Sequence, residues 1–256
     1  MSGDDRYSRF EYRRLIAWDE RIKREWPMLE RVLGSAPSRR VLDLGSGTGE
    51  HARFLAAKGF QVIGIDASQS MIEKSAAETA EGDVRFVRGD MREVDQLVDG
   101  KFGGAICVGN ALPHLTEEGD LQRFAAALRK VLLPNAPVVI QILNYDRIEA
   151  KRERALPINF LPDPDDPAAT IVFVRLMELR PDRRVIFMPA TLKLRSDRDQ
   201  PLELMMSQRV EIRGWRREEI ERTFRENGFS SIETFGAFDG AKFDRTESRD
   251  LILVAR

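Results

Sequence analysis

The sequence has little of what disulfide-bonded, metal-binding and membrane proteins are built from. Its 256 residues include a single cysteine, Cys107, so an intrachain disulfide and a cysteine-based metal cluster are excluded. No apolar run approaches the length of a membrane-spanning helix, and the polar segment 1–6 lacks the apolar core of a signal peptide. We therefore expect a cytoplasmic protein with no membrane contact and no bound metal.

The sequence also lacks an excess of charge of either sign. Its 41 lysines and arginines are balanced by 42 aspartates and glutamates, which leaves a net charge of −1. The arginine pairs at 183–184 and 216–217 stand among acidic residues, as on a solvated face rather than a track for phosphates. These features favour a globular protein without a nucleic-acid partner.

A glycine-rich turn at residues 41–50, V-L-D-L-G-S-G-T-G-E, is the strongest local signal. An apolar run carrying Asp43 turns through three glycines into a helical segment, and such a turn brings backbone close to a nucleotide-like ligand. The dinucleotide fingerprint needs a glycine at position 50, where Glu50 stands. A ligand-free glycine turn in an α/β domain is the alternative.

The turn resembles the first motif of class I S-adenosylmethionine (SAM)-dependent methyltransferases. The resemblance implies SAM as cofactor and an α/β fold, a Rossmann-like seven-stranded, mostly parallel sheet with helices on both faces. It assigns cofactor contacts in the turn to Asp43, Gly45, Ser46, Gly47 and Gly49.

Two later strand ends carry further cofactor candidates. The run 61–66 ends in Asp66, where doubly wound folds place an acidic side chain that accepts the ribose hydroxyls. The alternative is an N-cap for the next helix, although Ser68 can provide that cap itself. Met71, just inside that helix, is a candidate neighbour of the adenine or plain core.

The third strand, within 83–91, ends in Gly89-Asp90. The resemblance implies that Asp90 accepts from the adenine amino group and that Met91 packs on the ring; a simple turn is the alternative. The fourth and fifth strands are expected at 103–109 and 138–143, with a helix from about 116 between them. Because carboxyl ends of parallel strands line the ligand crevice, Gly109 and Asn110 join the cofactor candidates.

The segment 1–34 is predicted to be a helical cap. Helical spacing over residues 8–33 is interrupted by Pro27, so a break and a second short helix are expected there. In many small-molecule methyltransferases of the resembling family such a segment covers SAM, which suggests that Trp18 and Arg21 close the pocket. An arginine would then meet the methionyl carboxylate. A solvated surface helix is the alternative.

The methyltransferase domain is predicted to comprise 35–145 and 214–256, interrupted by an insertion at 146–213. A proline-rich connector at 146–167 precedes three strand-like runs, 170–178, 184–195 and 203–213, which suggest an antiparallel meander. We expect the insertion to be a lid, a substrate wall or the contact of a homodimer. Its position is similar to that in glycine and sarcosine N-methyltransferases and in amino-sugar N,N-dimethyltransferases.

Methyl transfer from SAM needs alignment of donor and acceptor, and a base only when the acceptor arrives protonated. His114, after the fourth strand, is the candidate base, and Tyr145, after the fifth, is a candidate for the substrate pocket; a structural loop histidine is the alternative. The loop 110–113 is N-A-L-P and lacks the Pro-Pro-aromatic run of enzymes that methylate base amines. We therefore expect a small-molecule acceptor, with N-methylation favoured over O-methylation. The alternatives are an NAD(P)-dependent oxidoreductase and a non-catalytic SAM-binding module.

Overall fold

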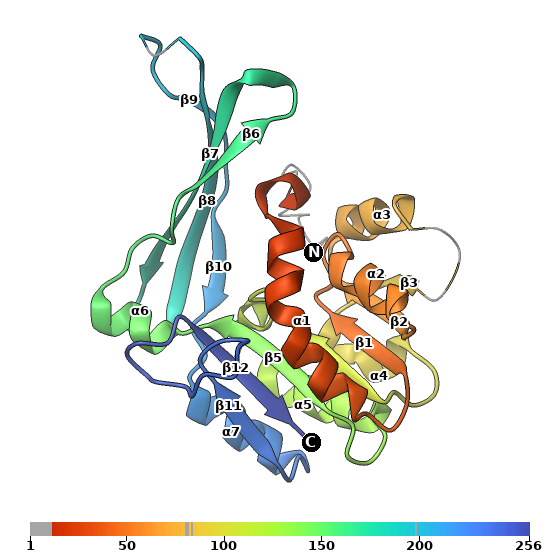
Figure 1. Ribbon diagram of the computed structural model, residues 1–256. Helices are drawn as coiled ribbons and strands as arrows, with labels where there is room; N and C mark the ends of the chain where they lie inside the picture. Colours follow the sequence, from red (N-terminus) through yellow and green to blue (C-terminus); the bar gives the residue numbers. More distant parts are fainter. Residues whose placement is uncertain (1–11, 80–81, 83, 198) are drawn as a thin grey trace.

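The computed structural model describes residues 12–256 apart from 80, 81, 83 and 198 (Figure 1). The part of the predicted cap at residues 1–11 lies outside the described residues. Within the described ranges, no helix is long and apolar enough to cross a membrane.

A seven-stranded sheet forms the centre of the molecule, in the order β11-β12-β5-β4-β1-β2-β3. All neighbouring strands are parallel except β12, which is antiparallel to both β5 and β11. The strands are β1 (Arg40–Leu44), β2 (Gln61–Asp66), β3 (Val84–Arg88), β4 (Gly104–Cys107), β5 (Val138–Leu143), β11 (Ile232–Phe235) and β12 (Asp250–Ala255). The predicted Rossmann-like sheet is confirmed. The almost continuous burial of β1, β4 and β5 explains their unalternating apolar sequences.

Helices cover both faces of this sheet (Figure 1). One face packs against α1 (Trp18–Gly34) and α2 (Glu50–Ala57), through Met28, Leu33 and Leu55. The other packs against α5 (Asp120–Val131) and α7 (Arg217–Glu226), through Phe124 and Phe224. The remaining short elements are η1 (Tyr12–Leu15), α3 (Gln69–Ala77), η2 (Met91–Glu93), α4 (Val94–Leu97), η3 (Leu112–His114) and α6 (Tyr145–Lys151).

Helix α1 runs through Pro27 without a break, so the predicted second helix is wrong. Residues before and after the proline share one buried face, with Glu25 on one side and Met28, Leu29 and Val32 on the other. Packing of this face against the sheet outweighs the loss of one backbone hydrogen bond at the proline.

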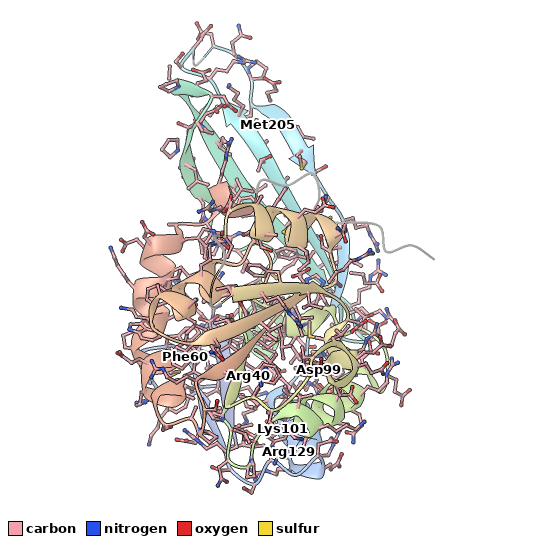
Figure 2. The ribbon with its side chains drawn as sticks, turned by 90° about the vertical axis from the view of Figure 1, so that its right-hand side faces the viewer. Arg40, Phe60, Asp99, Lys101, Arg129 and Met205 are labelled. Atoms are coloured by element: carbon pink, nitrogen blue, oxygen red, sulfur yellow. The ribbon has the colours of Figure 1, made fainter. Side chains whose placement is uncertain are left out.

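The insertion forms a second, five-stranded antiparallel sheet, which we call the arm (residues 159–213). Its strands are β6 (Asn159–Asp163), β7 (Asp166–Leu179), β8 (Arg184–Leu194), β9 (Glu203–Ser207) and β10 (Val210–Arg213). The predicted connector 146–167 is wrong in part, because it contains α6 and β6, and the third predicted run is divided into β9 and β10. The arm projects beyond the central sheet; Met205 on β9 lies far from Arg40 and Lys101 (Figure 2).

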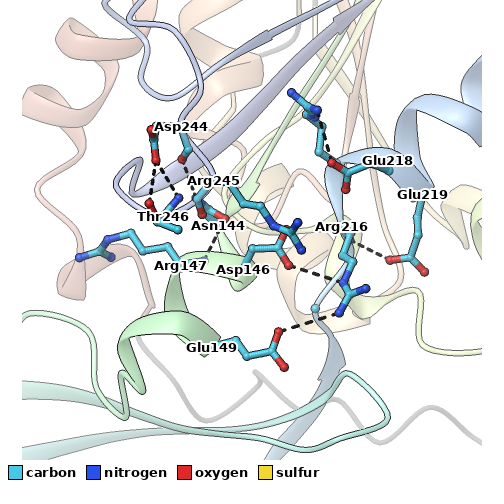
Figure 3. Close-up of polar contacts among 12 residues, drawn as sticks. Asn144, Asp146, Arg147, Glu149, Arg216, Glu218, Glu219, Asp244, Arg245 and Thr246 are labelled. Carbon is cyan, nitrogen blue, oxygen red and sulfur yellow. Dashed lines mark hydrogen bonds and ion pairs between the residues drawn. The ribbon is translucent and has the colours of Figure 1, made fainter.

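Buried charge anchors the arm at its base. Figure 3 shows Asp146 and Glu149 of α6 beside Arg216 at the start of α7. Asp146 on α6 is 7% exposed and pairs with Arg183 at 3.2 Å, with Arg245 at 3.2 Å and with Arg216 at 3.6 Å. Glu149, one turn later, pairs with Arg183 at 2.7 Å. These arginines come from the β7–β8 turn, the start of α7 and the β11–β12 loop. The network therefore fixes the arm to several elements of the central domain at once.

Candidate active site

A cavity of ≈ 480 Å³ opens at the carboxyl ends of β1, β2, β3 and β4. The sequence-predicted residues that line it are Trp18, Arg21, Asp43, Gly45, Ser46, Gly47, Asp66, Met71, Asp90, Met91, Gly109, Asn110 and His114. Gly49 and Tyr145 are the two predicted site residues that do not line it. The crevice therefore gathers residues from four strand ends and from α1.

The glycine turn needs glycine for two different reasons. Gly45, Gly47 and Gly49 have φ angles of 72°, 55° and 85°, which disfavour any residue with a Cβ atom. A Cβ atom at Gly45 would stand 2.5 Å from that of Ala111, whereas one at Gly47 would meet nothing within 4 Å. At Gly49 it would overlap the Phe86 ring. Gly49 thus serves packing of α2 on the sheet and does not line the cavity, and its cofactor contact stays a prediction.

Asp66 faces the cavity from the end of β2. Its Oδ2 accepts from the Gly47 amide at 2.8 Å and its Oδ1 from the Ser68 amide at 2.9 Å. Helix α3 is capped by Ser68, whose hydroxyl accepts from the Met71 amide at 3.2 Å. Asp66 is therefore not the N-cap of α3, and its carboxylate holds the glycine turn against β2.

The end of β3 carries a charged pair. Asp90 accepts from the Arg92 amide at 2.9 Å and pairs with the Arg92 guanidinium, which also reaches Asp120 at 2.7 Å. Burial tends to raise the pKa of Asp90, but the hydrogen bonds from Arg92 outweigh it, so the pKa lies below its usual value. An ionised Asp90 is a hydrogen-bond acceptor at neutral pH, as an adenine amino group requires.

Asp43 on β1 is an unusual carboxylate. It is 2% exposed, and its Oδ2 has no hydrogen-bond partner among the described residues. Burial raises the pKa of Asp43 to about 6, with nearby Asp66 and Glu50 adding to the shift and His51 and Arg21 opposing it. A buried acceptor without a partner is costly in free energy, which indicates that it serves a ligand.

Helix α1 contributes Trp18 and Arg21 to the wall of the cavity. The Arg21 guanidinium lies 5.0 Å from the centre of the Trp18 ring, and Trp18 meets His51 edge to face at 5.8 Å. A Cβ atom at Gly109 would lie 3.0 Å from Nη2 of Arg21, so this arginine reaches across to the loop after β4. The helix and that loop therefore approach each other across the cavity.

Polar side chains hold the loop after β4 in a strained conformation. Gly109 and Asn110 have φ angles of 76° and 65°, and the second is in the left-handed region without being glycine. The Gly109 amide donates to Oε1 of Gln141 at 2.7 Å. Asn110 Oδ1 accepts from the Leu143 amide at 3.0 Å and from the Tyr145 hydroxyl at 3.1 Å.

Tyr145, predicted to lie in the substrate pocket, does not line the cavity. The residue is 1% exposed, and burial raises the pKa of its hydroxyl above the ordinary value. Its contact with Asn110 makes it a support of the loop after β4. The neighbouring Asn144 caps α6 by accepting from the Arg147 amide at 3.2 Å.

His114 is exposed on η3 and lines the cavity, on the same loop as Asn110 and Ala111. The predicted loop position is thus correct.

Several residues of the site lack a local sequence signal. Gln141 and its partner Asp250, linked at 2.8 Å, are 109 positions apart, and Glu25 meets His51 from 26 positions away. Arg92 and Ser68 also line the cavity and were not predicted as site residues. The only sequence signal for them is that each lies two residues after a predicted residue, Asp90 or Asp66.

Comparison with known proteins identifies a methyltransferase domain within the chain. A family model described as a methyltransferase domain matches residues 41–135. The chain is 33% identical over 137 residues to glycine/sarcosine N-methyltransferase of Parasynechococcus marenigrum, covering 53% of this chain and 49% of that protein. It is 30% identical over 125 residues to human glycine N-methyltransferase, covering 43% and 42%. Residues 41–135 therefore form a methyltransferase domain.

Solved structures share the fold of this chain over most of its length. The SAM-bound amino pentose methyltransferase CalS10 of Micromonospora echinaspora superposes with a TM-score of 0.68 at 20% identity, covering 96% of this chain and 94% of that one. A SAM-dependent methyltransferase of Clostridium acetobutylicum gives 0.71 at 15% identity, covering 98% and 95%. By sequence, the chain spans about half the length of the curated relatives it matches.

The chemistry of the residues that line the cavity fits SAM. Besides Asp43 Oδ2, two buried polar atoms lining it have no partner among the described residues, the donors Trp18 Nε1 and Ser46 Oγ. The amino-acid part of SAM offers a carboxylate for donors and an ammonium for Asp43. A dinucleotide fits less well, because Glu50 replaces the third glycine and its carboxylate is bonded to Thr48 at 2.6 Å and to Arg53 at 3.1 Å.

Proposed function

We propose that the protein transfers a methyl group from SAM to an amine of a small molecule. The observation that carries this proposal is the cavity itself, where strand ends and α1 present acceptors and donors suited to each part of SAM. Similarity to proteins named glycine/sarcosine N-methyltransferase favours an amine over a hydroxyl. We place the acceptor beside the loop after β4, whose residues Asn110, Ala111 and His114 line the cavity.

The cofactor supplies an activated methyl group. The chain therefore has to bind the cofactor and the acceptor, align them and exclude water. Asp66 receives the ribose hydroxyls, Asp90 and Met91 hold the adenine, and Arg21 and Asp43 hold the amino-acid part. Residues Gly109 and Asn110, fixed by Gln141 and Tyr145, form the wall next to the methyl group.

His114 is proposed to take the proton from an acceptor amine that arrives protonated. We expect His114→Gln to lower kcat at pH 7 by about 10²-fold, the lower range for general base catalysis. The affinity for S-adenosylhomocysteine (SAH) should stay unchanged, because the cofactor contacts lie elsewhere. Steady-state rates across pH, with SAH titration as the control, test this. Unchanged kcat at neutral and lower pH would assign proton removal to solvent.

Transfer of label from SAM tests the proposed reaction. The full chain is incubated with methyl-labelled SAM and a panel of small amines, amino sugars, amino acids, phenols and RNA. We expect label in one or more amines and none in RNA. Label in phenols alone would contradict N-methylation, and SAM binding without transfer to any compound would favour a non-catalytic module.

The arm is proposed to have a different role on each face of its sheet. Ile171 and Phe173 on one face pack with Leu15 of η1. Just after the arm, Trp215 Nε1 donates to the Leu115 carbonyl at 3.1 Å, which joins this part of the chain to the loop after β4. We propose that this side of the arm walls the acceptor pocket.

The opposite face of the arm is apolar and exposed. Strand register places Phe160, Leu176 and Leu204 on this one face, and they are 66%, 45% and 60% exposed. Exposed apolar side chains gathered on one face are typical of an interaction site. We propose that it is the contact of a homodimer.

Light scattering tests the dimer. The wild-type chain should have about twice the monomer mass of 29.2 kDa. Replacing Phe160 and Leu204 together with serine should give the monomer, while Leu202→Ser, which removes an equally exposed apolar side chain outside the strands, should not. A wild-type chain that is monomeric at high protein concentration would contradict the proposal.

A further inference from the structure

A buried carboxylate stands directly behind the wall of the cavity. Glu25 on α1 is 2% exposed and does not line the cavity. Its Oε1 accepts from Nε of Arg21 at 2.7 Å, and its Oε2 lies 2.6 Å from Nε2 of His51 on α2. Both of its partners do line the cavity.

The contact with Glu25 determines which atoms Arg21 presents to a ligand. Because Nε is taken by Glu25, the two terminal Nη groups are the ones left to point towards Gly109 and the cavity. A pair of Nη groups is the fork that binds a carboxylate with two parallel hydrogen bonds. Without Glu25, the long side chain of Arg21 would have several rotamers available and would lose that orientation.

Glu25 is ionised in this setting. Burial tends to raise its pKa, but the hydrogen bond with His51 and the positive charge of Arg21 outweigh it, and the pKa lies below the usual value. The carboxylate therefore attracts Arg21 as a full charge. Its burial costs free energy that only well-placed partners offset.

Attachment of α1 to the domain does not need this charge. Met28, Leu29, Val32 and Leu33 bury the same helix against the sheet through apolar contacts. Glu25 lies at the cavity end of that buried face, where apolar packing gives way to Arg21 and Trp18. The position of Glu25 therefore indicates a role at the cavity rather than in the attachment of α1.

We propose that Glu25 is a positioning residue that orients Arg21 for the carboxylate of the cofactor's amino-acid part. The inference rests on the proposed function and adds to it a residue that never touches the ligand.

Two cofactor analogues separate this role from a structural one. SAH has the amino-acid part, and 5′-methylthioadenosine has the same adenine, ribose and sulfur without it. In calorimetry with the full chain, Glu25→Gln should weaken SAH binding about 10-fold or more, the value of one charge-assisted hydrogen bond. Binding of 5′-methylthioadenosine should be unchanged. Glu20→Gln, on the same helix in the exposed pair with Lys23, is the matched control and should change neither.

The outcomes are distinct. Equal weakening of both analogues by Glu25→Gln would show that Glu25 holds the cavity as a whole, and unchanged SAH affinity would show that it has no role; either overturns the inference. A wild-type chain that binds neither analogue would overturn the proposed function itself.

The variant Arg21→Ala gives an independent measurement that leaves the contact of Glu25 with His51 in place. It should weaken SAH binding selectively, and adding Glu25→Gln to it should cause no further loss, because the two residues act as one unit. Additive losses in the double variant would contradict the inference.

Discussion

Replacing Asp66 with alanine is expected to weaken SAH binding by about 100-fold while the chain stays folded. In the proposed complex the carboxylate accepts two ribose hydroxyls, and charge-assisted hydrogen bonds of this kind are worth about 1.5–3 kcal/mol each. The side chain also accepts from the Gly47 and Ser68 amides, which positions the glycine turn for the ligand. Calorimetric titration with SAH measures the loss, and circular dichroism checks the fold.

Asp239→Ala is the matched control. Asp239 accepts from the amide two residues later, Ala241, at 2.9 Å, as Asp66 does from Ser68, but it lies in the loop after β11 and outside the cavity. This variant should bind SAH normally. Unchanged affinity in Asp66→Ala would mean that the ribose lies elsewhere.

Replacing Asp43 with asparagine is expected to make the ligand-free protein more stable and its binding of SAM weaker. The pKa of Asp43 is raised by burial to about 6, so ionisation costs the folded state free energy that the unfolded chain does not lose. The difference from the ordinary value of 3.8 corresponds to about 3 kcal/mol. Asparagine removes this cost, but it also removes the charge that attracts the ammonium of SAM.

The pH dependence gives the sign of the Asp43 effect. A raised folded-state pKa means that stability falls as pH rises from about 4 to about 6 and is then constant. The asparagine variant should therefore be more stable by about 2–3 kcal/mol in denaturant titrations at pH 8 and equal to wild type near pH 4. Lower stability of the variant at pH 8, or undiminished SAM binding, would contradict the assignment.

The parts of the site that the sequence predicts are those defined by neighbouring residues. Asp66 ends a short apolar strand, Asp90 follows β3 by two residues, and parallel strands place such ends at one edge of a sheet. Glycines with positive φ are likewise specified locally, as at Gly45 and Gly47. These signals sufficed to place most cofactor candidates around one cavity.

The parts that the sequence did not predict depend on contacts between distant residues. Pro27 signalled a helix break that packing of α1 overrides. Tyr145 is a polar residue at a strand end like Asp66, yet its hydroxyl turns inward to Asn110, 35 positions away. Glu25 contacts His51, and Gln141 accepts from the Gly109 amide. Nothing in the sequence next to Glu25 or Gln141 indicates these partners.

Titration of the full chain with SAM and, separately, with NADH tests the central claim most directly. The residues around the cavity predict that one SAM binds per chain and that NADH does not bind. Binding of NADH without binding of SAM would contradict the account. The glycine turn, Asp66 and Asp43, whose Oδ2 has no hydrogen-bond partner among the described residues, would then bind a dinucleotide.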